Sequence, residues 1–188
     1  MDKIDLRIVK TYAKLTAALS EMMNEKPFDD ITVFDLCERA CVRRATFYKH
    51  FKDKYDFLRD VTKRIIKECA SSILTEEKHN MSAEEYLSKF VNEAIVYFEK
   101  NPSILSNMLD SNTFPVMFDI ITDCTHTALL EKLTDANRLG ANITTDLMLT
   151  ADFINGGIAN ILLEWLKNPS IEKSVLLIKI KEILAKMF

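Results

Sequence analysis

The chain contains few residues that form turns and no long apolar run. Only three of its 188 residues are glycine and four are proline, whereas an all-β sandwich or barrel needs a turn about every 8–12 residues. The first residues, Met1 to Asp5, include no apolar signal segment. No apolar run approaches the length of about 20 residues that spans a membrane. These absences exclude an all-β fold and predict a mostly helical, cytoplasmic protein with short connections.

Cysteine is scarce as well, with four residues in the chain: Cys37, Cys41, Cys69 and Cys124. In the cytoplasm we expect these side chains to be reduced thiols. Cys37 and Cys41 are four residues apart, but the nearest histidine, His50, has no second histidine beside it to complete a metal site. We therefore interpret both as small core residues and expect no metal and no cofactor. A redox-sensing role for Cys41, which lies close to an arginine pair, stays open as an alternative.

Cys124 and His126 are the residue types of a catalytic nucleophile and its base. Neighbouring positions on a helix do not face each other, and the sequence supplies no third catalytic member. A small helical enzyme is therefore the weaker alternative, and we expect that the chain is not an enzyme.

The net charge of −3 conceals a local excess of basic residues. Residues 1–60 hold 12 Lys and Arg against 11 Asp and Glu, and residues 61–188 hold 13 against 17. Within residues 39–54 only Asp53 is acidic. The basic residues there are Arg39, Arg43, Arg44, Lys49, Lys52 and Lys54. This cluster is the feature that suggests an anionic partner.

Apolar residues recur every three or four positions along most of the chain, which is typical of amphipathic helices. The expected helices cover residues 8–22, 33–40, a short segment ending near 52, 53–74, 82–98, 102–109, 115–133, 144–166 and 170–187. Thr32, Asp53, Ser82 and Ser170 are the predicted N-caps. Pro102 follows Asn101 at the position where a helix tolerates proline best.

The two short helices on either side of Ala40-Cys41-Val42 form a candidate helix-turn-helix. Phe47 and Phe51 are expected to pack inward, and Ala45 is small enough for close approach to DNA. The residues left for DNA on the outer face are Arg43, Arg44, Thr46, Tyr48, Lys49 and His50. Basic and hydroxyl side chains around a small residue are what a helix in the major groove needs.

The stretch from Lys26-Pro27-Phe28 through Thr32-Val33 to Thr46-Phe47-Tyr48-Lys49-His50-Phe51 and Lys54 resembles the DNA-binding domain of TetR/AcrR-type transcriptional regulators. The resemblance is specific over about residues 7–58. Beyond residue 61 it rests on the number of helices and on Gly156-Gly157 followed by Glu164-Trp165-Leu166. It implies an all-α, nine-helix TetR-like fold. Residues 1–58 would be the helix-turn-helix domain, and residues 59–188 a helical domain for ligand binding and dimerisation.

The resemblance also assigns roles to residues. Thr32, Tyr48, His50 and Lys54 match phosphate contacts, whereas Arg44 and Thr46 fall where family members reach base edges. Cys41 stands where the family usually has glycine, and a positive φ there would strain a cysteine by about 1 kcal/mol or more. Arg43 stands where the family usually has a capping residue. Because arginine cannot cap a helix N-terminus, we interpret Arg43 as a DNA contact.

The last two expected helices carry apolar residues on more than one side, which predicts burial against a second subunit. The predicted dimer interface comprises Ile154, Gly157, Ile158, Ile161, Trp165, Ile180, Ile183 and Leu184. The resemblance further implies an effector pocket in the larger domain. The candidate lining residues are Phe90, Met108, Met117, Phe118 and Trp165.

These observations predict a homodimeric, ligand-responsive transcriptional regulator. We expect a repressor that a small-molecule effector releases from a pseudo-palindromic double-stranded DNA operator. The alternative is an activator or co-activator of the same fold that a protein partner controls and that has no small-molecule pocket.

Overall fold

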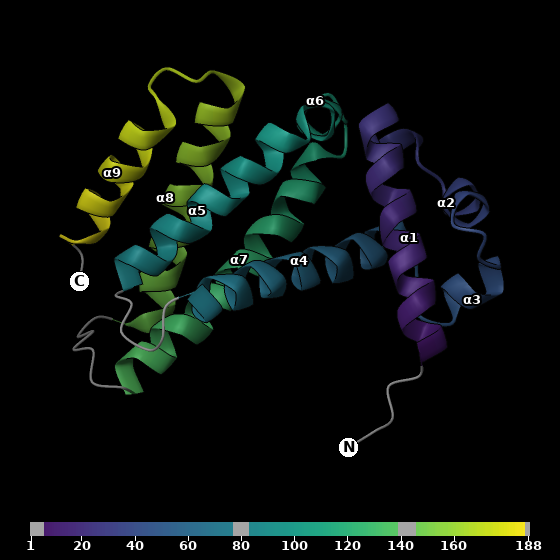
Figure 1. Cartoon of the computed structure of the whole chain (residues 1–188), viewed down its shortest axis with the longest axis horizontal. Helices are drawn as coiled ribbons and strands as arrows, with labels where there is room; N and C mark the ends of the chain where they lie inside the picture. The colour runs from purple at the N-terminus through teal and green to yellow at the C-terminus, as the bar shows by residue number, and fades with distance from the viewer. Residues whose placement is uncertain (1–5, 77–82, 139–145, 187–188) are drawn as a thin grey trace. The chain divides into compact units, whose positions relative to one another are not determined.

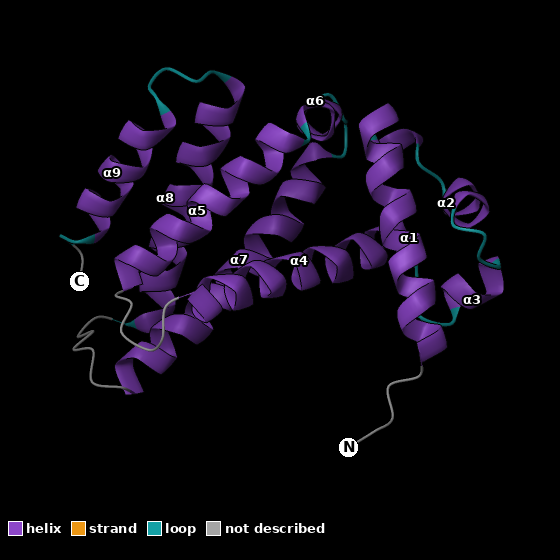
Figure 2. Ribbon diagram, in the orientation of Figure 1, coloured by secondary structure: helices purple, strands orange, loops and turns teal. Residues whose placement is uncertain are grey.

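The computed structural model describes residues 6–76, 83–138 and 146–186 (Figure 1). All regular structure in these ranges is helical (Figure 2). The α-helices are α1 (Leu6–Glu25), α2 (Val33–Arg39), α3 (Arg44–Tyr48), α4 (Lys54–Glu76), α5 (Ala83–Lys100), α6 (Pro102–Leu109), α7 (Phe114–Arg138), α8 (Leu147–Lys167) and α9 (Lys173–Leu184). A 3-10 turn, η1 (Phe28–Asp30), precedes α2. The predicted all-α class with nine helices is confirmed. None of the described helices is long and apolar enough to cross a membrane.

The chain forms two compact units. Unit 1 comprises residues 1–62 and 100–120, and unit 2 comprises residues 63–99 and 121–188. The chain therefore passes from one unit to the other three times: within α4, at the end of α5 and within α7. The division after residue 58 stays a prediction, and it did not anticipate that residues 100–120 join the N-terminal helices.

Unit 1 is built around α1, which packs against α2 and α6. Its centre is apolar, and Leu15, Phe28 and Phe57 are almost completely buried. Residues 100–120 are also held by polar contacts. The Asn107 side-chain amide donates to the Met23 carbonyl (2.9 Å), and the Asn112 backbone N–H donates to Asp29 Oδ2 (2.7 Å). These hydrogen bonds fix α6 and the start of α7 to the N-terminal helices.

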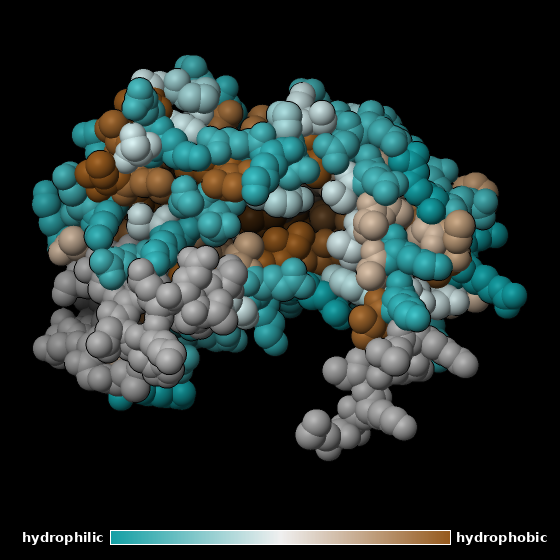
Figure 3. Space-filling view, in the orientation of Figure 1, coloured by the Kyte–Doolittle hydropathy of each residue, from teal (hydrophilic) through white to brown (hydrophobic). Residues whose placement is uncertain are grey.

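Unit 2 has its own core, formed by buried residues of α4, α5, α7, α8 and α9. Ile95, Leu133 and Ala151 lie at its centre with almost no exposed surface. Two ion pairs fasten α9 to α5: Lys173 to Glu99 (2.8 Å) and Lys181 to Glu85 (3.2 Å). Apolar residues also reach the surface over α9, where they appear brown in Figure 3.

The helix boundaries correct one predicted cap. The N-cap of α9 is Glu172, without a side-chain hydrogen bond, so the prediction of Ser170 is wrong. The N-cap of α8 is Asp146, whose carboxylate accepts from the Leu149 N–H (2.9 Å), and the predicted start at residue 144 lies outside the described residues. Ser82 lies outside the described residues. Pro102 is the first residue of α6, as predicted.

Candidate nucleic-acid interface

The first helix of the motif, α2, is capped as its sequence predicts. Thr32 Oγ1 accepts a hydrogen bond from the Asp35 N–H (3.1 Å). The return hydrogen bond from Thr32, together with the nearby Lys26 ammonium, lowers the pKa of the Asp35 carboxyl. At the other end of α2, Arg39 forms a hydrogen-bonded ion pair with Glu25 of α1. This pair holds α2 against α1 and removes Arg39 from the set of unpaired bases.

The turn between α2 and α3 contains the strained residue that the sequence predicts. Cys41 has φ 53°, the only positive φ among the described residues other than glycine. The Cys41 N–H donates to the Glu38 carbonyl (3.1 Å), and the Val42 N–H donates to the Cys37 carbonyl (2.9 Å). These two bonds reverse the chain tightly enough to bring α3 back across α2. Glycine adopts this conformation without strain, whereas cysteine does not.

An aromatic cluster of Tyr12, Phe47, Phe51 and Phe57 anchors α3. Phe47 is fully buried, and its ring centroid lies 5.7 Å from that of Phe57 on α4. Phe51 lies 4.8 Å from Phe57 and 6.5 Å from Tyr12 of α1. Both phenylalanines therefore point inward, as predicted. The orientation of α3 is fixed from behind by close-packed rings rather than by its own length of five residues.

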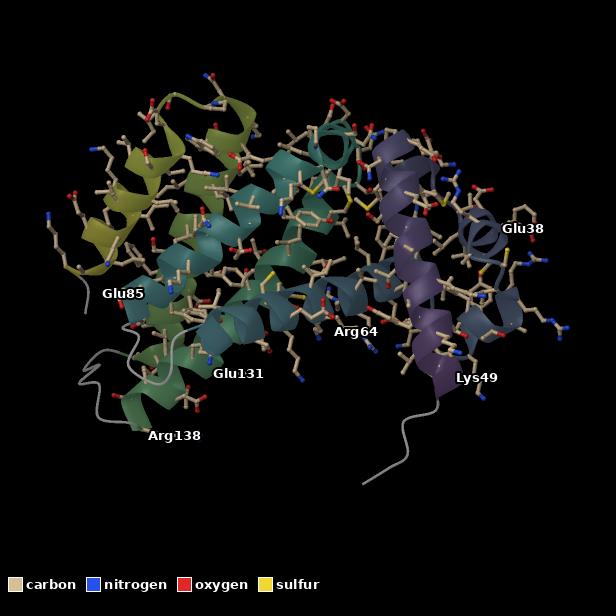
Figure 4. All side chains as sticks on the ribbon, viewed as in Figure 1. Glu38, Lys49, Arg64, Glu85, Glu131 and Arg138 are labelled. Atoms are coloured by element: carbon tan, nitrogen blue, oxygen red, sulfur yellow. The ribbon has the colours of Figure 1, made fainter. Side chains whose placement is uncertain are left out.

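The opposite face of α3 is exposed and basic. Arg43, Arg44, Ala45, Tyr48, Lys49 and His50 are exposed, and Thr46 is half-buried. Arg43 occupies the N-cap position of α3 without a side-chain cap, as predicted. Among the described residues, no carboxylate pairs with Arg43, Arg44 or Lys49, and Figure 4 shows Lys49 at the end of α3, beside the start of α1. The motif thus presents unpaired cations around a small residue.

Lys54 has a structural role that the sequence did not reveal. Its ammonium donates to three carbonyls of the preceding loop: Phe28 (2.9 Å), Asp29 (3.1 Å) and Ile31 (3.0 Å). It also lies 4.6 Å from the centroid of the Phe28 ring. Burial lowers the pKa of Lys54, and the Asp29 and Asp30 carboxylates oppose this shift. An ammonium has three N–H donors, so none is left here for a phosphate oxygen. The phosphate contact of Lys54 stays a prediction.

Phe34 belongs to this surface but was not among the predicted site residues. It is 54% exposed, and the Arg44 guanidinium carbon lies 5.6 Å from its ring centroid. The sequence of α2 could have indicated this exposure, because Phe34 lies outside the buried stripe formed by Leu36, Cys37 and Ala40. Phe34 thus adds an exposed aromatic ring beside the basic face of α3.

The candidate effector residues do not form one group. Phe90 and Trp165 pack against the core of unit 2, and the Trp165 indole N–H donates to the Ile171 carbonyl (2.8 Å). Met108, Met117 and Phe118 lie instead within the residue range of unit 1. The first two of these are buried there.

Part of the predicted dimer interface belongs to the core of a single chain. Ile154, Ile180 and Leu184 are buried in unit 2 and are not available on its surface. Ile158, Ile161 and Trp165 pack partly against the same core. Gly157 and Ile183 are exposed. The exposed apolar residues that the prediction omitted are Met148, Leu149, Phe153, Val175 and Ile178.

The residues of the alternative sites differ in exposure. Cys124 is buried, and His126 Nε2 lies 3.1 Å from Asp152 Oδ1 on α8. Cys41 is exposed and Cys37 is buried. Within the described ranges, no group of three or more His, Cys, Asp or Glu side chains is placed to hold a metal ion.

Comparison with known proteins agrees with this geometry. Residues 15–61 match the family model described as bacterial regulatory proteins of the tetR family. A segment of 63 residues is 35% identical to the uncharacterized HTH-type transcriptional regulator YxbF of Bacillus subtilis (strain 168). That match covers 33% of this chain and 17% of the relative, so the chain spans less than a fifth of the relative's length.

Solved structures share the fold over most of the chain. The fatty acid degradation regulator FadR from Bacillus halodurans has a TM-score of 0.64 at 17% identity, covering 92% of this chain and 97% of its own. FadR from Bacillus subtilis, solved in complex with stearoyl-CoA, has a TM-score of 0.61 at 18% identity, covering 94% and 99%. At these identities the likeness establishes the fold alone.

The buried aromatic anchor, the exposed basic face of α3 and the matched segment together define a helix-turn-helix DNA-binding domain. Residues 15–61 form a DNA-binding domain of the tetR family, as the sequence resemblance implies, and the chain shares the fold of solved transcriptional regulators. The matched family and the structural neighbours are DNA-binding transcriptional regulators, which are not enzymes.

Proposed function

We propose that the chain is a cytoplasmic, homodimeric repressor that a small-molecule effector releases from its operator. The observation that carries the proposal is the exposed basic face of α3 on a helix whose inner face is fixed by Phe47 and Phe51. Arg44 and Thr46 would read base edges. Phosphate contacts would come from Thr32, Arg43, Tyr48, Lys49 and His50.

The exposed apolar surface of α8 and α9 supports a dimer. Phe153 is 71% exposed and Leu149 is 68% exposed, one turn apart on α8. Gly156 and Gly157 follow on the exposed side of α8, and a Cβ added at either would meet nothing within 4 Å. Each glycine within a helix costs about 1 kcal/mol relative to alanine. Close approach of a second helix at this open surface would explain both features.

Two chain connections would carry a signal from unit 2 to unit 1. α4 continues from one unit into the other, and residues 100–120 are bound to α1 through Asn107 and Met23. An effector that binds one arrangement of unit 2 more tightly would shift the separation of the two α3 helices in the dimer. The two half-sites of an operator lie one helical turn of DNA, about 34 Å, or a multiple of it apart. If the two α3 helices of the dimer had another separation, they could not bind both half-sites at once.

Selection from a random duplex library with the full chain tests the proposal. We expect a pseudo-palindromic site and, for Arg44→Ala, a loss of discrimination of about 1–3 kcal/mol at the base that Arg44 reads. Lys179→Ala removes an exposed charge of α9 and is the matched control. Failure to enrich any sequence would contradict operator binding, and equal weakening on selected and random DNA would exclude Arg44 from base reading.

Stearoyl-CoA is the first effector probe, because a protein of this fold was solved in complex with it. Trp165 is the single tryptophan of the chain and lies in unit 2, so its fluorescence reports on that unit. We expect saturable quenching or a spectral shift together with release of the selected DNA. Release without a saturable change, or a change without release, would contradict acyl-CoA control.

A further inference from the structure

The Arg44 side chain does not extend freely into solvent, because it lies over the ring of Phe34. The guanidinium carbon is 5.6 Å from the ring centroid, within the range of cation–π contacts. Phe34 is 54% exposed, so it is not held in place by the core of unit 1. Leu36 and Cys37, which follow it on α2, are the residues that face the core. Packing therefore gives no reason for an aromatic ring at position 34.

The geometry of the guanidinium gives a reason. Its N–H donors lie in the plane of the group. Stacking on a ring uses the face of that plane and leaves the edge free to donate. The same edge makes the paired hydrogen bonds to O6 and N7 of guanine in the major groove. An Arg44 guanidinium that keeps its face on the Phe34 ring would be held in one orientation while its base-reading donors stay available.

The stack also reduces what Arg44 loses on binding. A free arginine side chain has about 2 kcal/mol of rotamer entropy, part of which is lost when the side chain is fixed on a base. Because Phe34 restricts Arg44 before DNA arrives, less of that loss falls on the binding step. The benefit applies to the base that Arg44 reads and not to phosphate contacts, since a phenyl ring cannot donate to a phosphate oxygen.

We infer that Phe34 is a specificity-determining positioning residue, which acts by orienting Arg44 for guanine in the operator. This inference rests on the proposed DNA-binding function. It assigns to α2, which is otherwise the supporting helix of the motif, a part in base discrimination.

Phe34→Leu tests the inference, because leucine keeps an apolar side chain at the position and removes the ring. The probe is the duplex selected by the wild-type chain, compared with the same duplex carrying a substitution at the guanine read by Arg44. We expect the affinity ratio of these two duplexes to fall about 2- to 5-fold. The dependence of affinity on salt concentration should stay unchanged, because no phosphate contact is lost.

Two further variants separate positioning from other roles. Phe34→Tyr restores the ring and should restore discrimination. In the background of Arg44→Ala, Phe34→Leu should change the ratio less than about twofold, since pairs in contact are not additive. The urea midpoint of Phe34→Leu should match that of the wild type, which a merely structural role would not allow.

Three results would overturn the inference. The first is an unchanged affinity ratio of the two duplexes in Phe34→Leu. The second is a higher ratio, which would mean that the ring competes with DNA for Arg44. The third is an equal effect of Phe34→Leu in the presence and absence of Arg44. The last would mean that the ring itself contacts a base. Failure of the wild-type chain to select any duplex would instead contradict the proposed function, so the two failures are distinguishable.

Discussion

Replacing Lys54 tests the contact of one ammonium with three backbone carbonyls in unit 1. Lys54→Met keeps an unbranched side chain that is one atom shorter, and it removes three hydrogen bonds, to the carbonyls of Phe28, Asp29 and Ile31. A hydrogen bond to a charged group contributes about 1.5–3 kcal/mol. The three share one ammonium, whose burial costs part of the gain, as the lowered pKa of Lys54 indicates. We therefore expect a loss of unfolding free energy of about 2–4 kcal/mol.

Urea unfolding followed by far-UV circular dichroism measures this loss. Hydrogen exchange then shows whether the amides of residues 28–61 open more readily. Lys52→Met is the matched control, because Lys52 is exposed and its side chain lacks a partner among the described residues. We expect that control to change stability by less than about 0.5 kcal/mol.

DNA binding separates the structural role of Lys54 from a phosphate contact. If the ammonium is fully used by carbonyls, the slope of log affinity against log salt for Lys54→Met matches that of the wild type. Loss of one phosphate contact would reduce the slope by about one unit. A reduced slope with unchanged stability would refute the structural account and support the role that the family resemblance assigns.

Three further predictions follow from the described residues. Cys41→Gly should raise the unfolding free energy by about 1 kcal/mol, because glycine tolerates the positive φ; Cys41→Ala, which keeps a Cβ, should give no such gain in the same urea titration. Phe153→Asp should yield folded monomers by light scattering, because the side chain is 71% exposed on one chain; a dimeric variant would place the interface elsewhere. Acid should destabilise unit 1, because hydrogen bonds from Arg39 lower the pKa of Glu25 and those from Thr113 and Asn112 lower the pKa of Asp29. The ionised carboxylates stabilise the fold above their ordinary pKa of about 4, so the urea midpoint should fall as pH decreases below that value; a midpoint independent of pH there would contradict it.

Local features of the fold could be predicted from the sequence because their causes lie within a few residues. The Thr32 cap is three residues from its partner Asp35, and the strain of Cys41 arises from a turn that only its neighbours define. The inward direction of Phe47 and Phe51 follows from helical periodicity.

Contacts between distant segments could not be predicted in the same way. Lys54 donates to carbonyls that are 23 to 26 residues earlier, and no side-chain pattern marks a backbone acceptor. Asn107 reaches a carbonyl that is 84 residues away. A polar residue on a short helix carries no sign of which backbone it will meet, because that partner is set by the packing of whole helices.

The exposed surface of α8 that a second subunit could bind was also not predictable from the sequence, because it too depends on how whole helices pack. α8 carries apolar residues on several sides, so periodicity indicates burial without indicating which side meets the core. The core of unit 2 takes the side with Ala151 and Ile154. The side with Leu149, Phe153 and Gly157 is left exposed. A second subunit can bind only what the first leaves uncovered, and so the surface to test begins at Leu149 and Phe153 rather than at Ile154.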